Sequence, residues 1–350
     1  MEITGGGRLE VRITHLDVGK RVSIRRLVGS SSGNPAFTDA VGVLTSWDEG
    51  VLVITRRTGE MVRVPESSLV AGKVVPAAPA RRRGPAATFE ELTRVGARAW
   101  QPVESEPLGD WTLRAAYAPG GGRGFTRRAN SALALGDPGL PLGAALDRVQ
   151  EWYGARGLPA YVQAATGAAG TQEVLCAELE RRGWAREVSA AVRIGALAPI
   201  ADTTRVTDSA IGRVGLSRSV DDSWLRRYQR SAEPGPEVLA VLTAGPGPGS
   251  VWFATVPDPS GVPAAIGRCV VDGRWAGFMA VEVGPAHRRQ GLGTAVMAAL
   301  ARRALDEGAS AAWLQVETEN EGAGALYAGM GLVTHHLYHH YRAPRRGSAT

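Results

Sequence analysis

The first quarter of the chain alternates short apolar runs with turn-forming residues. The runs cover residues 11–13, 21–25, 40–44, 51–54 and 61–64. They are rich in β-branched side chains, which is typical of strands. Asp48-Glu49-Gly50 and residues 57–60 have the turn chemistry that joins neighbouring antiparallel strands. No helical periodicity interrupts them, so residues 1–76 are predicted to form a small five-stranded all-β barrel.

Beyond residue 87 the pattern changes to a mixture of helices and strands. Residues 77–87 are rich in proline and arginine, which indicates a linker. The spacing of apolar side chains then predicts helices at residues 89–98, 142–155 and 173–182. Strand-like runs occupy residues 111–117, 125–133, 160–163 and 188–194. Residues 88–195 are therefore predicted to form a mixed α+β unit.

The last third of the chain repeats the order of these elements. Tyr161-Val162-Gln163, a helix and Gly183-Trp184 correspond to Trp313-Leu314-Gln315, a helix and Gly331-Leu332. The correspondence predicts an internal duplication, although few side chains match and convergence on a common strand-helix-strand pattern is the alternative. Residues 205–343 are thus predicted as a second mixed unit, which a connector at residues 196–207 joins to the first.

Composition narrows the class of protein without identifying a function. Of the 350 residues, 44% are hydrophobic and 21% are charged, which is typical of a folded protein of two or three domains. Basic residues number 40 and acidic residues 34, and the excess lies mainly in residues 1–87. A solvated surface explains this small excess better than a nucleic-acid partner does. The alternative is that the basic barrel tethers nucleic acid or protein.

Neither a membrane nor a metal is indicated. No run reaches the roughly 18–20 apolar residues of a spanning helix, and the first residues lack a signal-peptide profile, so we expect a cytoplasmic protein. Cys176 and Cys269 lie too far apart in sequence for a disulfide framework or a CxxC motif. The pairs His335-His336 and His339-His340 split across the faces of a predicted strand, with no cysteine or carboxylate nearby, so we predict no metal site.

The clearest chemical signal is a glycine-rich turn between a strand and a helix. The strand at residues 278–283 leads through Gly284-Pro285 to a helix that begins near Thr294. Backbone N–H groups at a helix N-terminus lack intrahelical acceptors and carry partial positive charge, so such a turn can bind phosphate oxygens. The turn has neither the Gly-Lys-Ser/Thr ending of a Walker A loop nor the GxGxxG of a dinucleotide site.

A third phosphate-binding pattern matches this turn. It resembles the pyrophosphate loop of the GNAT superfamily of acyl-CoA-dependent N-acyltransferases, which has the form Arg/Gln-x-x-Gly-x-Gly/Ala. The matching residues are Arg288, Arg289, Gln290, Gly291, Leu292 and Gly293. The second motif of that family, Asn-x-x-Ala-x-x-Leu-Tyr followed by Gly-Phe, resembles the segment from Asn320 to Tyr327 followed by Gly331-Leu332. Leu332 in place of phenylalanine is the one departure.

The resemblance extends to the organisation of the whole chain. It is similar to actinobacterial GNAT proteins that have an SH3-like N-terminal barrel and are sometimes labelled histone acetyltransferases. A mixed α+β GNAT fold is implied, with residues 88–195 and 205–343 as a tandem pair of GNAT-like halves. The first half is expected to be degenerate, because Asp137 would repel a pyrophosphate and two prolines remove amide donors. Its expected role is to wall the acceptor cleft of the second half.

By resemblance, the second half transfers an acetyl group from acetyl-CoA to a primary amine of a small molecule or protein, by direct attack in a ternary complex. Acetyl-CoA would lie where the strand ending at Val283 separates from the strand ending near Val316. Backbone groups of Val281 and Val283 would bind the pantetheine arm, and the Val283 amide would donate to the thioester oxygen. The amides from Arg289 to Thr294 would hold the pyrophosphate, with charge from Arg288 and Arg289.

Two side chains of the second motif have implied roles and structural alternatives. Asn320 would contact the pantetheine amides, and Tyr327 would protonate the departing thiolate as a general acid. Alternatively, Asn320 is a helix N-cap and Tyr327 is a core aromatic residue.

The general base and the acceptor stay open at this stage. Some relatives carry a glutamate at the position of Gln315, which cannot act as a base. Glu282 and Glu317 are the nearest carboxylates, and each is equally interpreted as a surface charge. The alternative function is a non-catalytic acyl-CoA sensor or interaction module. The oligomeric state, monomer or homodimer, is also open.

Overall fold

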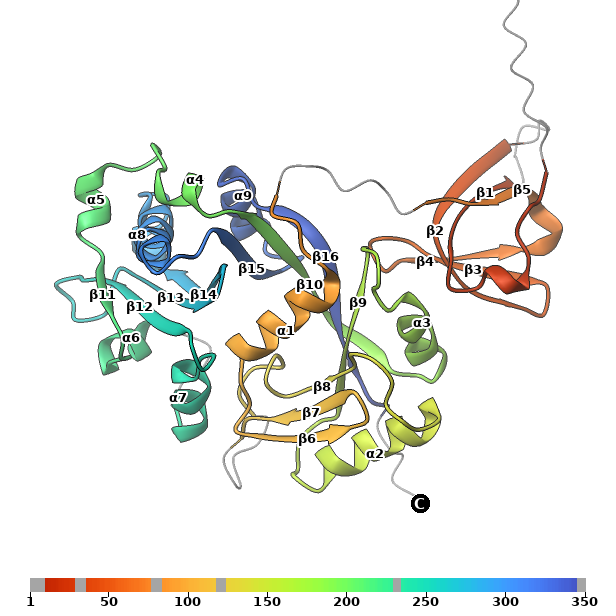
Figure 1. Ribbon diagram of the computed structural model, residues 1–350, viewed down its shortest axis with the longest axis horizontal. Coiled ribbons are helices and arrows are strands. Elements are labelled where there is room, and N and C mark those ends of the chain that lie inside the picture. The colour runs from red at the N-terminus through yellow and green to blue at the C-terminus, as the bar shows by residue number, and fades with distance from the viewer. Residues whose placement is uncertain (1–9, 29–35, 77–83, 118–123, 229–233, 345–350) are drawn as a thin grey trace, which may run out of the picture. The chain divides into compact units, whose positions relative to one another are not determined.

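The computed structural model describes residues 10–28, 36–76, 84–117, 124–228 and 234–344 (Figure 1). Most of the predicted linker lies outside these ranges. Contacts within the chain divide it into two compact units. The first unit consists of Met1–Arg81 and Ala164–Trp184, and the second consists of Arg82–Gln163 and Ala185–Thr350.

The described residues of the first unit contain a 5-stranded antiparallel sheet in the order β4-β3-β2-β1-β5. The strands are β1 (Arg21–Val28), β2 (Ala36–Asp48), β3 (Val51–Thr55), β4 (Met61–Pro65) and β5 (Leu69–Val74). Alternate side chains point inward, so that Val22, Ile24, Leu44, Leu52 and Ile54 are buried together. The predicted small all-β domain is therefore confirmed.

The fifth strand of this domain is not where the sequence pattern placed it. Residues 11–13 contribute only an isolated bridge between Val11 and Gly72, and the fifth strand is Leu69–Val74. Gly72 weakens the strand pattern of that segment, but a Cβ there would lie 2.9 Å from Ile13. The glycine therefore leaves room for Ile13, which is buried in the core.

The first unit also includes a segment from the middle of the chain. Helix α3 (Glu173–Arg181) contacts β2, and Thr166 Oγ1 donates to the carbonyl oxygen of Arg57 over 3.4 Å. A Cβ on Gly167 would lie 2.8 Å from the same oxygen, so the two backbones approach closely. The barrel thus packs against a segment that lies about a hundred residues later in the sequence. Arg57 and Thr166, for example, are 109 positions apart.

The described residues of the second unit form an 11-stranded sheet in the order β11-β12-β13-β14-β15-β10-β16-β9-β8-β7-β6. Its strands are β6 (Glu104–Leu108), β7 (Trp111–Ala115), β8 (Ala132–Leu133), β9 (Tyr161–Thr166), β10 (Ala185–Ala196), β11 (Gly215–Ser217), β12 (Ser250–Val256), β13 (Ala265–Asp272), β14 (Trp275–Val283), β15 (Ala311–Glu317) and β16 (Val333–Arg342). Its helices are α1 (Phe89–Ala99), α2 (Leu142–Gly154), α4 (Ala198–Ala201), α5 (Asp208–Gly212), α6 (Asp222–Arg227), α7 (Pro236–Thr243), α8 (Leu292–Asp306) and α9 (Glu321–Gly329).

The final strands of the two halves exchange places in this sheet. Strand β10 closes the first half in sequence, yet it pairs antiparallel with β15 from Ala190↔Glu317 to Ala196↔Ala311. Strand β16 closes the second half and lies between β10 and β9. Each half therefore completes its part of the sheet with a strand from the other half, which is why both belong to one unit.

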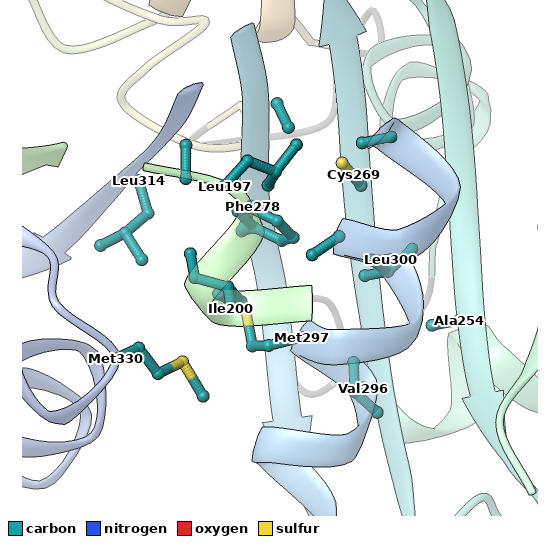
Figure 2. Close-up of a cluster of buried hydrophobic side chains, with 14 of the residues drawn as sticks. Leu197, Ile200, Ala254, Cys269, Phe278, Val296, Met297, Leu300, Leu314 and Met330 are labelled. Atoms are coloured by element: carbon teal, nitrogen blue, oxygen red, sulfur yellow. The ribbon is translucent and has the colours of Figure 1, made fainter. Parts of the chain in front are cut away.

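The main core of the second half lies between one face of the sheet and α8. Phe278 and Leu314 from the strands pack there with Met297 and Leu300 of α8 (Figure 2). Ile200 of α4 joins the same cluster and is 1% exposed. The segment at residues 196–207 is thus not the loose connector that its composition indicated.

Helix α1 crosses the opposite face of the same sheet. Trp313 and Gln315 alternate with Leu314 and so point to this face. A Cβ on Gly96 of α1 would lie 3.5 Å from Gln315 Nε2. At its other end, the ring of Phe89 packs edge-on against His336 of β16 at 5.2 Å between centroids. A helix of the first half therefore covers strands of the second.

Two strand predictions in the first half were inaccurate. Of residues 125–133, only Ala132–Leu133 forms a strand. The side chain of Asn130 forms hydrogen bonds with backbone groups that a neighbouring strand would otherwise use. Its Oδ1 accepts from the Ala116 amide over 2.9 Å. Strand β6, at Glu104–Leu108, was missed because its charged residues and proline are unfavourable in strands.

Candidate functional site

The parallel strands β14 and β15 separate partway along their length. Their pairing runs from Trp275↔Ala311 to Phe278↔Leu314 and goes no further among the described residues. Strand β14 nevertheless continues to Val283 and β15 to Glu317. The two strands therefore enclose a gap with unpaired backbone groups, at the place where the sequence predicted that the strands diverge.

A bulge in β14 marks the start of this gap. Arg268↔Met279 and Ile266↔Glu282 are successive pairs with β13, so β14 carries one extra residue between them. Ala280 has a left-handed backbone, with φ of 51°. The bulge turns β14 away from β15 while it stays paired with β13.

The backbone of Val283 points into the gap. The Gly284 amide donates to the Ala264 carbonyl on the β13 side over 2.9 Å. Backbone N–H groups alternate between the two edges of a strand, so the Val283 amide points toward β15 instead. By the same alternation the Val281 amide also points toward the gap. Both predicted backbone donors therefore face the open edge.

The turn after β14 leads into an uncapped helix N-terminus. After a short 3-10 helix at Pro285–His287, Arg289 and Gly291 have left-handed backbones with φ of 62° and 77°. Gly291 is the N-cap of α8 and offers no side-chain hydrogen bond to the helix. The amides of Leu292, Gly293 and Thr294 therefore lack intrahelical acceptors.

Some side chains of the turn are exposed, and others are buried or bonded to the protein. Arg288 and Arg289 are exposed, and Gln290 is tied to its own turn through Nε2, which donates to Ala286 over 3.2 Å. Thr294 is buried at 6% exposure. His287 lies 3.2 Å from Asp258 and so belongs to the loop structure.

The two predicted motifs meet at Gly293. A Cβ on Gly293 would lie 3.6 Å from the side chain of Val283 and 3.5 Å from that of Leu326 on α9. The strand end, the helix start and the second motif are therefore within contact distance of one another. Gly293 itself has an ordinary backbone conformation and room for a small side chain.

Asn320 and Tyr327 both have the structural roles that were considered as alternatives. Asn320 caps α9, and its Oδ1 accepts from the Ala323 amide over 3.1 Å. Tyr327 is 9% exposed and belongs to the core cluster with Val316 and Met330. Capping leaves the amide nitrogen of Asn320 available for a ligand.

The two candidate carboxylates differ in exposure. Glu282 is half-buried on β14 opposite Ile266. Glu317 is exposed at the end of β15, opposite Ala190 of β10. On β15, between β14 and the exchanged strand, Gln315 Oε1 and Trp313 Nε1 are buried without hydrogen-bond partners in the described part of the chain. Neither of these two side chains was predicted to bind a ligand.

A buried arginine was also missed. Arg268 is 0% exposed and donates to the carbonyls of Leu242 and Ala244 at the end of α7 and of Ala99 at the end of α1, over 2.7, 2.8 and 3.0 Å. Burial lowers the pKa of Arg268 to about 10, so it is still charged at neutral pH. Its position within an otherwise apolar strand is the signal that could have identified it.

The histidines of β16 lie mostly in the core of the sheet. Among the described residues, no group of three potential ligands is close enough to hold a metal ion. His336, His339 and His340 are each at most 2% exposed, and burial lowers the pKa of His336 and of His339 to about 3. They are neutral core residues on the strand that the sequence predicted.

The turn of the first half that corresponds to the pyrophosphate loop has its amides already occupied. The Asp137 amide donates to the Asp110 carboxylate over 3.0 Å, and the Gly139 amide donates to the Asp137 carboxylate over 2.8 Å. Pro138 and Pro141 have no amide hydrogen to donate. Carboxylates of the chain itself thus accept the hydrogen bonds that these amides would otherwise donate to an anionic ligand.

Two family models match the chain. One, described as "Probable histone acetyltransferase Rv0428c C-terminal", matches residues 87–341. The other, described as "Rv0428c N-terminal Sm-like domain", matches residues 16–73. The barrel is thus Sm-like, where the sequence predicted an SH3-like barrel, and its small all-β character is unchanged.

Individual proteins are similar over most of the chain. "Probable histone acetyltransferase Rv0428c" of Mycobacterium tuberculosis is 27% identical over 325 residues, which cover 91% of this chain and 93% of the relative. "Uncharacterized N-acetyltransferase YobR" of Bacillus subtilis is 25% identical over 263 residues, 73% of this chain and 99% of the relative.

A solved structure confirms the fold. The "GCN5-related N-acetyltransferase from Kribbella flavida" superposes with a TM-score of 0.51 at 16% identity, over 73% of this chain and 97% of that protein. The predicted mixed α+β fold is therefore correct. Within the described residues, no helix combines the length and apolar character of a membrane-spanning segment.

Proposed function

Since the chain belongs to the GNAT-type acyltransferase family described as "Probable histone acetyltransferase Rv0428c C-terminal", we propose that it transfers an acetyl group from acetyl-CoA to a primary amine. The amine attacks the thioester directly in a ternary complex. The acceptor is a small molecule or a protein amino group. No metal takes part in this scheme.

One observation carries the proposal, namely that the gap between β14 and β15 opens beside the uncapped start of α8. Val283 at the strand end and Gly293 at the helix start are near neighbours. A diphosphate at the amides of residues 289–294 gains hydrogen bonds and the favourable end of the helix dipole. The pantetheine arm then extends along the open edge of β14, where Val281 and Val283 offer backbone groups.

The reaction proceeds by addition and elimination at the thioester carbon. A C–N bond forms as the neutral amine attacks, and the Val283 amide stabilises the negative charge that develops on the carbonyl oxygen. The C–S bond then breaks, and Tyr327 donates its phenolic proton to the thiolate of CoA. Asn320, with its amide nitrogen free of the cap, binds the pantetheine amides.

The proton that the amine loses goes to a carboxylate, directly or through water. Glu282 is adjacent to Val283 on β14, and Glu317 ends the strand on the other side of the gap. Both stay candidates for this role. Acyl transfer is fastest when the amine is uncharged, so the rate is expected to rise with pH toward the pKa of the acceptor.

Calorimetric titration with acetyl-CoA tests the proposed site. A Gly293→Val side chain would lie against Val283 and Leu326 and block the anion, so we expect at least tenfold weaker binding with little change in melting temperature. Gly322→Ala is the matched control, because nothing lies within 4 Å of a Cβ there. Absence of binding at millimolar acetyl-CoA in the wild type contradicts the proposal.

A non-catalytic acyl-CoA sensor is the second candidate, favoured by Gln315 at a position where a base would be expected. Replacement of Tyr327 by phenylalanine separates the two functions. For an enzyme we expect kcat to fall by about 100-fold, while the Kd of acetyl-CoA stays within twofold. If acetyl-CoA binds but no amine in a broad panel is acetylated, the sensor is the correct function.

A further inference from the structure

This inference rests on the proposed function and concerns the acceptor. On one face of the sheet, the gap between β14 and β15 is closed by the core, where Phe278, Leu314 and Val316 pack with α8 and α9. The opposite face is crossed by α1, which covers Gln315, and on this inference the amine reaches the thioester from that face. Met279 and Gln315 lie on that face, because they alternate with Phe278 and Leu314.

The face from which the amine arrives is called the acceptor face. The guanidinium of Arg128 lies on this face, where neighbouring side chains hold it in position. Arg128 Nε donates to the Tyr338 hydroxyl over 2.8 Å. Its Cζ lies 5.9 Å from the centroid of the Tyr338 ring and 5.7 Å from that of Trp100. Within the described parts of the chain, no carboxylate pairs with Arg128, and its two terminal nitrogens have no acceptor. The side chain is half-buried, so its charge is only partly hydrated.

Arg128 is connected to the gap by a chain of three contacts. The Trp100 ring that it contacts also packs against Arg268, with Cζ 5.4 Å from the ring centroid. Arg268 in turn contacts the sulfur of Met279 over 2.7 Å. Met279 is the first residue of β14 beyond the last β14–β15 pair. Trp100 and Arg268 therefore connect the guanidinium to the start of the gap, on the side from which the amine arrives.

A second side chain next to Arg128 has no hydrogen-bond partner among the described residues. Both ring nitrogens of His340 are buried without a hydrogen bond, and its ring lies 5.4 Å from that of Tyr338. Burial, with Arg128 as the strongest charged neighbour, holds the pKa of His340 well below its ordinary value. A neutral imidazole has one N–H to donate, and here that donor is unused.

We propose that Arg128, assisted by His340, binds a carboxylate group of the amine acceptor. With Nε held by Tyr338, the two terminal nitrogens form a planar fork that matches the two oxygens of a carboxylate. Trp100 and Tyr338 fix the plane of the fork. The acceptor is thus an amino acid or a similar amine that carries an acid group, and the first half of the chain supplies its specificity.

Matched acceptors test this assignment. Acetyl transfer, followed as release of the CoA thiol, is compared for an amino acid, its carboxamide and the amine without the carboxylate. We expect kcat/KM for the acid to exceed that for the amide at least tenfold, mainly through KM. In Arg128→Gln this preference falls to less than twofold, while Arg128→Lys keeps part of it.

Arg127→Gln is the control, because that neighbouring guanidinium already pairs with Glu187 at 3.1 Å. It is expected to leave the preference unchanged. A preference for the amide or for lysine-rich basic peptides overturns the proposal, and so does an Arg128→Gln variant that still prefers the acid.

Calorimetry makes the same comparison without turnover and keeps the two proposals distinguishable. The amino acid is titrated into the wild type and into Arg128→Gln, with and without CoA. Binding of the acid that depends on Arg128 supports this site even if acetyl-CoA does not bind. Acetyl-CoA binding with no measurable affinity for the acid at millimolar concentration overturns this inference alone.

Discussion

Single residues decide how the two halves are held together at the acceptor face. Arg268 has no carboxylate partner among the described residues, yet it is charged and fully buried. It is stabilised by carbonyl groups at the C-terminal ends of α1 and α7. These groups carry the negative end of the helix dipoles, so they substitute for a counter-ion.

Replacement of Arg268 tests this role at the level of stability. Arg268→Met leaves three buried carbonyls without a donor, and we expect the free energy of unfolding to fall by about 2–4 kcal/mol. Arg98→Met removes an exposed ion pair with Asp272 nearby and should cost less than about 1 kcal/mol. Urea unfolding of both variants measures the difference. Equal losses would show that the carbonyl network contributes nothing specific.

Among the elements, strands β14 and β16 differ in how completely they pair with neighbouring strands. Strand β14 breaks its pairing with β15 by means of a bulge, and so leaves backbone groups open for a ligand. Strand β16 is paired with β10 along its length and flanked by β9, and its histidines are buried. A histidine in a protein core is stable only in its neutral form, because burial disfavours the charged form. The stability of this strand therefore depends on pH.

Acid is therefore expected to destabilise the second unit through β16. The folded pKa of His336 and of His339 is about 3, below the unfolded value of about 6.5. The unfolded state then binds more protons, so stability is complete above pH 6.5 and is lost as the pH falls toward 3. Each such histidine contributes a slope of roughly 1.4 kcal/mol per pH unit.

The phenylalanine variant of His336 checks this slope. Urea unfolding at pH 7, 6 and 5 should give a loss with pH that is smaller in His336→Phe than in the wild type. His287→Gln, on the loop after β14, should leave the slope unchanged. A wild-type stability that is constant from pH 7 to pH 5 would contradict the account.

For the whole molecule, the exchange of β10 and β16 makes the halves of the second unit interdependent. Strand β10 is hydrogen-bonded on both sides to strands of the other half. Neither half can keep its own sheet complete if the other is removed. The same exchange brings α1 and Arg128 of the first half onto the acceptor face of the second.

Cleavage between the halves tests this interdependence. A protease site inserted after Asp202, an exposed position between α4 and α5, should give two fragments that stay associated on size-exclusion chromatography. Residues 205–350 expressed alone should be unfolded by circular dichroism, because β10 is missing from beside β15. Two fragments that separate and stay folded would contradict the exchanged sheet.

Features that depend on contiguous residues could be predicted from the sequence. The pyrophosphate turn at 288–293 and the segment from Asn320 to Tyr327 are local motifs, and they identified the family and the second half of the site. The helices and most strands followed from the apolar period. Strands β5 and β6 were missed because a glycine in one and charges with a proline in the other obscure that period.

The contacts between distant segments became evident only in the folded protein. The exchange of β10 and β16, the hydrogen bond from Arg268 to the end of α1, and the contact of Arg128 with Tyr338 join residues more than a hundred positions apart. No local pattern encodes such contacts, because they arise when the sheet forms and each unpaired strand edge finds a partner. The motifs of the proposed acetyl-CoA site could therefore be predicted from the sequence, whereas the proposed acceptor site depends on the fold.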